Sequence, residues 1–337
     1  MSTLDAFAAE IEQLVARADS ALRALSRTVL EKRNPPSGAY GFFHHSGHSI
    51  ARLIDCKLIL QRMVNTRRLL TQLAYGRNRV MPRDWPAGTP FPEEVQAVLR
   101  RDRQGVEHMK LDLESLYLFG GILLDQWAFQ VLAVGGTKSK TGNAFADLVD
   151  VLEAGSAAAL SPLWANHRDD ILWMHYQLRF YRNRFIVHAD RPWQRGTGHS
   201  VYGDDFNLHT PSPPGWLDDA ALDSDILSLL PLAPEALRRD PRRRTHPGAV
   251  IEALFDDIAR HGPADRKRIA DLFKRKGGST PNFQVLARRL LRLIALGTET
   301  LIPIAEANAA SVILGDPHST SAELSKRWRA ETSPLTE

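Results

Sequence analysis

Cysteine is nearly absent from this chain, and so are the long apolar runs that place a protein in a membrane. The single cysteine, Cys56, excludes a disulfide within one chain of 337 residues, and a reducing compartment is therefore expected. No window approaches the roughly 18 to 20 consecutive apolar residues of a membrane span. The N-terminal stretch is amphipathic and acidic, without the unbroken apolar core of a signal peptide. These absences predict a cytoplasmic protein with no membrane partner.

Parallel-strand patterns and internal repeats are missing as well, and almost every long segment shows helical spacing of its apolar residues instead. Hydrophobic residues make up 43% and charged residues 24%, which is typical of a folded soluble protein. The sequence predicts an all-α fold, a helical bundle with a turn-rich linker and a smaller helical C-terminal part. The expected domains are a bundle over 1–195, an irregular linker over 196–247, a helical region over 248–315 and a tail over 316–337.

Proline and glycine mark the expected helix ends. They predict helices from residues 2–3 to about 34, from 50 to 75, from 92 to 134, from 144 to 152, and from 162 to 191. Gly120 and Gly121 lie inside the third of these and predict either a bend or the close approach of another helix. Further on, 194–247 is rich in turn-forming residues, and both a β-hairpin and an ordered loop remain open there.

The C-terminal third is basic and helical. Between Ala236 and Leu293 there are fifteen Lys and Arg against six Asp and Glu, which suits either nucleic-acid binding or a solvated helical surface. Helical spacing over 248–310 falls into three pieces, divided at 261–263 and at 277–278. The last two pieces have the outline of a helix-turn-helix DNA reader. The second of them is strongly apolar, however, which favours a packing helix.

Three other sets of residues carry candidate chemistry. His44, His45 and His48 have the spacing of zinc ligands, but no cysteine or carboxylate completes a site by sequence, so a loop of hydrogen-bonding histidines is favoured and no metal is expected. The stretch GGTKSKTG, 135–142, resembles a phosphate loop but lacks the required spacing, and predicts a flexible basic loop. Asp125 interrupts an apolar run and is expected to need a buried partner, either a salt bridge or a basic residue of 181–190.

The segment YRNRFIVHAD, residues 181–190, combines two arginines, an asparagine and a histidine within seven positions. On a continuous α-helix each residue turns by about 100°, which places His188 on one stripe with Tyr181, Arg184 and, farther back, Asp170. Arg182 lies off that stripe, so it approaches His188 only by its long side chain, a helix break or a partner chain. Basic residues near a helix end also complement the helix dipole, and this structural role stays open.

Arg182-Asn183 followed by His188 resembles the R-x4-6-H signature of HEPN proteins, in which a polar residue often follows the arginine. The longer string YRNRFIVHAD is similar to a bacterial branch of that family, and the resemblance covers about residues 95–193. A long helix precedes the motif, as it does in such proteins. The resemblance implies a helical bundle, RNA cleavage without a metal or other cofactor, and a homodimer in which two motifs share one cleft.

Residue roles follow from the same resemblance. His188 is the expected general base or acid at the ribose 2′-hydroxyl or the leaving oxygen, and Arg182 is expected to hold the phosphate. Asn183 is expected to orient the phosphate or the arginine. Arg184 is a second phosphate contact, and Tyr181 completes the expected substrate-binding residues.

Three functions remain open at this point. The first is a ribonuclease acting as a toxin or in antiviral defence, with RNA as its substrate and an antitoxin or regulatory protein as a further partner. The second is a catalytically inactive HEPN-like protein that binds RNA or a protein partner. The third is a DNA-binding regulator that works through the basic C-terminal helices.

Overall fold

A computed structural model describes residues 3–33, 40–80, 89–178, 198–202, 205–209, 220–241, 243–245, 247–276 and 283–314. The described chain is all-α, apart from one short β-hairpin, and the predicted fold class is confirmed. The predicted tail, 316–337, lies outside the described residues.

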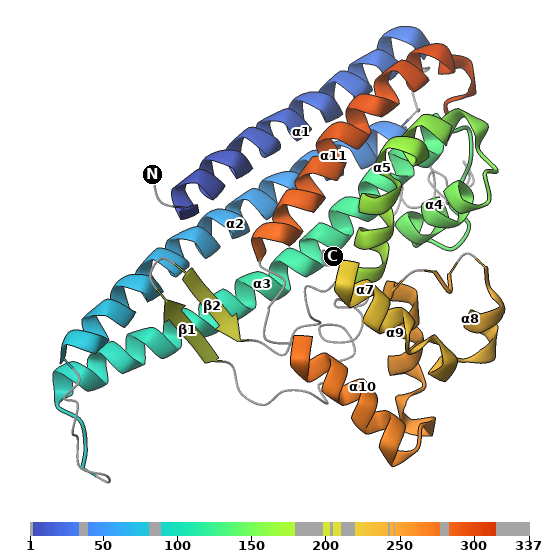
Figure 1. Ribbon diagram of the computed structural model, residues 1–337. Coiled ribbons are helices and arrows are strands. Elements are labelled where there is room, and N and C mark those ends of the chain that lie inside the picture. The colour runs from blue at the N-terminus through green and yellow to red at the C-terminus, as the bar shows by residue number, and fades with distance from the viewer. Residues whose placement is uncertain are drawn as a thin grey trace, which may run out of the picture. The chain divides into compact units, whose positions relative to one another are not determined.

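The described residues of the first half of the chain form three long helices and two shorter ones (Figure 1). Their bounds are α1 Thr3–Arg33, α2 Tyr40–Val80, α3 Glu93–Val134, α4 Ala144–Glu153 and α5 Ser161–Trp173, with a 3-10 turn, η1, at Ala158–Leu160. A π-helical turn, η2, continues α5 over Met174–Leu178. The predicted ends of the first, third and fourth helices agree with these bounds to within a few residues.

In the C-terminal half, the part of the chain that the structure describes consists of a hairpin and five helices. Strands β1 Gly198–Tyr202 and β2 Asp205–His209 pair antiparallel, with Ser200 opposite Asn207, so the hairpin left open for 194–247 is formed in its first part. Residues 220–227 and 235–239 of the stretch expected to be irregular are helical. The helices are α7 Ala220–Leu227, α8 Glu235–Arg239, α9 Pro247–Asp256, α10 Pro263–Lys276 and α11 Phe283–Ala307, with 3-10 turns η5 Leu230–Leu232, η6 Ile258–Arg260 and η7 Ala309–Ser311. The three predicted helical pieces over 248–310 are therefore confirmed.

The two ends of α3 show how the sequence sets the boundaries of a helix. Glu93 and Glu94 lie in its first turn, where their charge suits the positive end of the helix dipole. At the other end Gly136 has a φ of 69°, and the amide of Thr137 donates to the carbonyl of Leu132 at 3.0 Å. Glycine adopts this left-handed conformation without a steric penalty, so the helix ends at the predicted glycine pair.

The start of α2 differs from the prediction. Residues 40–49 were expected to be a glycine-broken stretch with a histidine loop, whereas the helix already begins at Tyr40. Phe42, Ser46 and Ser49 are buried along one face of this segment. Tertiary packing of that face outweighs the low helix propensity of its glycine and serine residues.

The chain divides into two compact units. Unit 1 comprises Met1–Val15, Ile54–Gly121 and Leu172–Leu291, and unit 2 comprises Ala16–Leu53, Ile122–Ile171 and Arg292–Glu337. Each unit contains parts of α1, α2, α3, α5 and α11, so residues from both halves of the sequence build each core.

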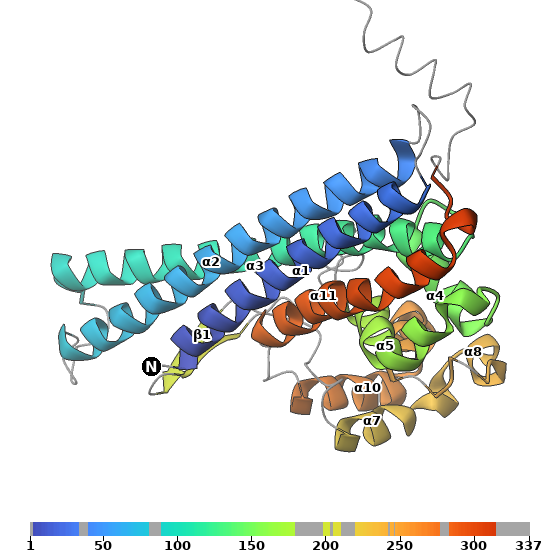
Figure 2. The same ribbon diagram turned by 90° about the horizontal axis from the view of Figure 1, so that it is seen from above.

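In unit 1, α1 and α11 lie side by side (Figures 1 and 2). The rings of Phe7 and Phe283 meet edge to face with centroids 5.5 Å apart. Arg288 covers Phe7 at 5.2 Å and donates to Glu10 at 2.8 Å. Gly120 of α3 faces Leu290, whose Cδ2 would lie 3.0 Å from an added Cβ. The close helix approach predicted at this glycine is therefore present.

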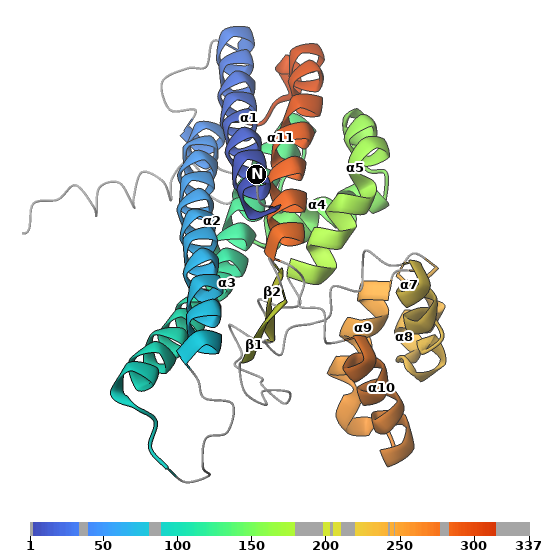
Figure 3. The ribbon, with the colours of Figure 1, turned by 60° about the vertical axis from the view of Figure 1, so that its left-hand side comes forward.

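Around α9, unit 1 forms a smaller group of helices. Helices α7 and α8 both contact α9 (Figure 3), and η2 contacts it as well. Ala249, Val250, Ile251 and Leu254 of α9 are all buried. The predicted C-terminal helical region thus packs directly onto the turn that follows α5.

In unit 2, Trp127 of α3 is completely buried against α11 and donates from Nε1 to Thr298 Oγ1 at 3.0 Å. Gln130 donates to Ser49 at 2.7 Å, which satisfies two buried polar groups between α3 and α2. At the surface Arg17 forms a bidentate pair with Glu299 at 2.6 and 2.7 Å. Helix α11 therefore contacts α1 in unit 2 as it does in unit 1, and the predicted domain boundaries stay a prediction.

Helix α3 is the one helix, among those the structure describes, that is long and apolar enough to cross a membrane. Of its most apolar window, 72% is buried inside the protein. Burial of this kind is typical of a core helix in a folded domain.

Candidate functional site

The residues predicted to carry chemistry lie outside the described residues. Tyr181, Arg182, Asn183, Arg184 and His188 all fall within 179–197. Their roles and mutual geometry stay a prediction. The structure does describe the segment that leads into them.

That segment is the π-helical turn η2, Met174–Leu178, at the end of α5. Met174, Tyr176 and Leu178 are buried, and Leu178 Cδ1 lies 3.4 Å from the position of a Cβ on Gly120. One residue earlier, Trp173 is covered by Arg289 of α11 at 5.1 Å. Helices α3, α9 and α11 therefore hold the entry to residues 181–190 in place.

The π turn also bears on one geometric prediction. Asp170 was placed on the stripe of His188 on the assumption of a continuous α-helix. Because hydrogen bonds in a π turn run from residue i to i+5, each residue in it turns by less than 100°. The continuous α-helix assumed for that stripe is therefore interrupted over Met174–Leu178, and the position of Asp170 relative to His188, which lies outside the described residues, stays a prediction. Single π turns inside α-helices occur frequently at functional sites.

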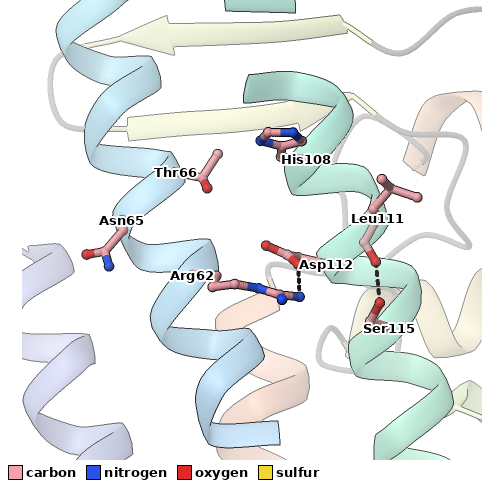
Figure 4. A pocket seen from close by; sticks show the side chains of 7 residues that line it. All are labelled: Arg62, Asn65, Thr66, His108, Leu111, Asp112 and Ser115. Carbon is pink, nitrogen blue, oxygen red and sulfur yellow. Dashed lines mark hydrogen bonds and ion pairs between the residues drawn. The ribbon is translucent and has the colours of Figure 1, made fainter. Parts of the chain in front are cut away.

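A groove between α2 and α3 is a second candidate, and it lies wholly in described parts of unit 1 (Figure 4). Its volume is about 460 Å³. Arg62 reaches across it from α2 to form an ion pair with Asp112 of α3, whose side chain is only 9% exposed. The lining residues are Arg62, Asn65, Thr66, His108, Leu111, Asp112 and Ser115. Apart from the ion pair, the groove offers an imidazole, an amide and two hydroxyl groups to a ligand.

Large apolar side chains are exposed on the same two helices. In unit 1 these are Ile54 at 49%, Leu58 at 54%, Leu69 at 45%, Tyr75 at 50%, Leu111 at 58% and Leu118 at 37%. Most surface apolar residues are isolated, but a set that recurs along two adjacent helices is typical of an interaction surface. Sequence spacing did not identify this groove, because its charged pair joins residues fifty positions apart.

Leu111 and Leu113 give a matched test of this interpretation, because they lie two positions apart on α3. Leu113 is only 2% exposed, and we expect Leu113→Ala to lower the free energy of unfolding by about 2–3 kcal/mol. Leu111→Ala should change it by less than about 0.5 kcal/mol. Urea denaturation followed by circular dichroism measures both. A large loss in Leu111→Ala would show that this side chain is packed, and that the groove rim is not an open surface.

Two other predicted features in unit 2 have structural roles. Asp125 accepts from the amide of Phe145 at 3.1 Å, so it satisfies a donor in the first turn of α4. In the loop 135–142 the carboxylate of Asp147 accepts from the hydroxyl of Ser139 and from the amides of Lys140 and Thr141 at 2.7 and 2.9 Å. The segment is a loop, as predicted, but these bonds fix its conformation.

The same bonds set the ionisation of Asp147. Burial alone would raise the pKa of this carboxyl group. The hydrogen bonds from Ser139, Thr141 and Lys140 favour the charged form and together outweigh burial, so the pKa lies below its ordinary value of 3.8. The resulting stabilisation is fully present above the ordinary value and is lost as the pH falls through it toward the folded-state pKa.

We expect Asp147→Asn to reduce the free energy of unfolding by about 1.5–3 kcal/mol at pH 7, because donors that now meet a charged acceptor would meet a neutral one. The variant should also lose less stability than the wild type between about pH 5 and pH 3. Chemical denaturation across this pH range measures both effects. Asp150→Asn is the matched control, since Asp150 is exposed on the same helix. If the stability of Asp147→Asn fell with pH as much as that of the wild type, the lowered pKa of Asp147 would be contradicted.

No family model, curated protein or solved structure matches this chain. Its function is therefore inferred from its own residues.

Proposed function

We propose that this protein is a metal-independent endoribonuclease of the HEPN type, acting as a toxin or a phage-defence effector. The observation that carries the proposal is the spacing of Arg182-Asn183 and His188, with five residues between the arginine and the histidine. The helical bundle is the fold that such a motif requires. The buried π turn just before the motif supports it further, because it anchors the segment on three helices.

In the proposed reaction the ribose 2′-hydroxyl attacks the neighbouring phosphorus and the bond to the 5′-oxygen breaks. One His188 accepts the proton of the 2′-hydroxyl, and a second His188 donates a proton to the leaving oxygen. The products are a 2′,3′-cyclic phosphate and a 5′-hydroxyl end. Since two proton carriers are needed, two copies of the chain supply them, and Arg182 need not reach the His188 of its own copy.

The remaining motif residues bind and orient the phosphate. The Arg182 guanidinium offers two parallel N–H donors to the phosphate oxygens and stabilises the charge that develops on them. Asn183 orients the phosphate or Arg182, Arg184 is a second phosphate contact, and Tyr181 belongs to the same substrate-binding group. Imidazole with its ordinary pKa near 6.5 serves as base and acid around neutral pH.

The test is RNA cleavage by the purified homodimer in excess EDTA, with sequencing of the new ends. We expect cleavage to persist without divalent ions and to leave cyclic phosphate at each 3′ end. Light scattering coupled to size exclusion gives the mass of the active species. A pure, inhibitor-free dimer that leaves all RNAs uncut would contradict the proposal.

The second candidate is a catalytically inactive HEPN-like protein that binds RNA or a protein partner. The α2–α3 groove and the exposed leucines beside it favour this candidate, because they provide a binding surface without any motif residue. RNA that is bound but uncut, or a stable complex with a regulatory protein, would support it. The third candidate, DNA binding through the C-terminal helices, is less favoured, since Leu286, Leu290, Leu291 and Ile294 of α11 are buried in packing.

A further inference from the structure

Two exposed histidines lie one turn apart on α2 in unit 2. His44 and His48 are at positions i and i+4, which places their Cβ atoms about 5–6 Å apart on one face of the helix. Their ring centroids are 4.3 Å apart, so the imidazoles already touch. Two imidazoles that can both take up a proton gain little stability from touching each other in water. What the i and i+4 spacing does provide is two imidazoles on one exposed helix face, close enough for both to bind one ion after the rings rotate apart.

We propose that His44 and His48 form a two-imidazole site for a divalent late transition-metal ion such as Zn²⁺ or Cu²⁺, with water at the remaining coordination positions. Tetrahedral coordination with Zn–N bonds of about 2.0–2.1 Å requires ligand nitrogens about 3.3 Å apart. The rings, whose centroids now lie 4.3 Å apart, must rotate away from each other to take an ion between them, and both side chains are exposed and can change rotamer. Imidazole is also the side chain that these ions prefer in mixed nitrogen and oxygen sites.

The helical turn that carries the pair is fixed from its buried side. His45 donates from Nδ1 to Gln126 Oε1 at 2.7 Å, and its ring stacks on Phe129 with centroids 4.2 Å apart. Ser49, immediately after His48, accepts from Gln130 at 2.7 Å. Because these contacts hold the backbone, binding an ion requires ordering only two exposed side chains.

The surroundings leave room for a hydrated ion. Among the residues that the structure describes, His44 and His48 form no hydrogen bond or ion pair. Gly47, between them, has no atom within 4 Å of the position where a Cβ would stand. Groups of three or more metal-ligating side chains do not occur in the described parts of the chain, so two protein ligands and water complete the site. The positive charge of Arg52, one turn farther along α2, repels a bound cation and therefore limits the affinity of the site for the ion.

The test is titration of the untagged full-length protein with Zn²⁺ by isothermal calorimetry in a non-coordinating buffer. We expect one ion per chain, and at least tenfold weaker binding in His44→Ala and in His48→Ala. His108→Ala is the matched control, since it removes an exposed imidazole from α3 and should leave the affinity unchanged. With Cu²⁺, which binds such ligands more tightly than Zn²⁺, electron paramagnetic resonance should show coupling to two nitrogens in the wild type.

Thermal unfolding gives a second measurement. An ion that binds only the folded chain raises the melting temperature, so Zn²⁺ should raise it in the wild type but not in His48→Ala. Circular dichroism confirms that each variant is folded. Equal Zn²⁺ affinity in the wild type and both alanine variants would overturn the proposal. The site is independent of the proposed ribonuclease, because cleavage is expected in EDTA and metal binding is not.

Discussion

Replacement of Trp127 by alanine is expected to reduce the free energy of unfolding by about 3–5 kcal/mol, the largest loss of stability that we predict for a single substitution. The indole is completely buried in unit 2 and donates to Thr298 at 3.0 Å. Its removal therefore leaves a large cavity and takes away the bond that the Thr298 hydroxyl accepts, although that hydroxyl still donates to the carbonyl of Ile294. Denaturation in urea, followed by circular dichroism, measures the change. Trp164→Ala is the control, because Trp164 is only partly buried, in α5 of the same unit.

Gly297 supplies a sharper test of the same contact. A Cβ at this position would lie 2.8 Å from Cζ2 of Trp127 and 3.3 Å from Cη2. Since the ring is enclosed and cannot move aside, we expect Gly297→Ala to cost about 1–3 kcal/mol. In a Trp127→Leu background the clash is absent, and the same substitution should cost far less. Additive effects in this double-mutant cycle would show that the two residues do not constrain each other.

Much of this packing was accessible from the sequence. The apolar residues of 283–294 recur at helical spacing and predicted a packing helix, and Leu286, Leu290 and Leu291 are indeed buried. Gly120 predicted either a bend or a close helix approach, and Leu290 lies against it. The glycine pair at 135–136 ended α3 as expected. These features are local, because helical period and glycine conformation act over a few residues.

The features that sequence spacing missed depend on contacts between distant segments. Residues 40–49 contain two glycines and three histidines and were expected to be irregular, yet packing of Phe42 and Ser49 makes them helical. The pairing of Arg62 with Asp112 likewise depends on how α2 lies against α3. Local propensity carries no information about either contact. The motif at 181–190 was found by resemblance, and its geometry stays a prediction.

That motif yields the prediction with the largest effect on activity. We expect His188→Ala to lower the rate of RNA cleavage by at least about 100-fold, because removal of a general acid or base typically costs a factor of about 10²–10⁴. Single-turnover cleavage of a labelled RNA in EDTA measures the rate. The wild-type rate should follow a bell-shaped pH profile, since one histidine must be neutral and its symmetry mate protonated.

His44→Ala is the matched control for this experiment, because it removes an imidazole that has no part in the proposed reaction. It should weaken Zn²⁺ binding at least tenfold and leave cleavage in EDTA unchanged, while His188→Ala should leave Zn²⁺ binding unchanged and lower the rate of cleavage. Mixed dimers add a further constraint. If two copies each supply one proton carrier, a dimer of wild-type and His188→Ala chains should be far less active than half the wild type. Mixed dimers with half the activity would show that each chain cleaves RNA on its own, which contradicts a shared cleft.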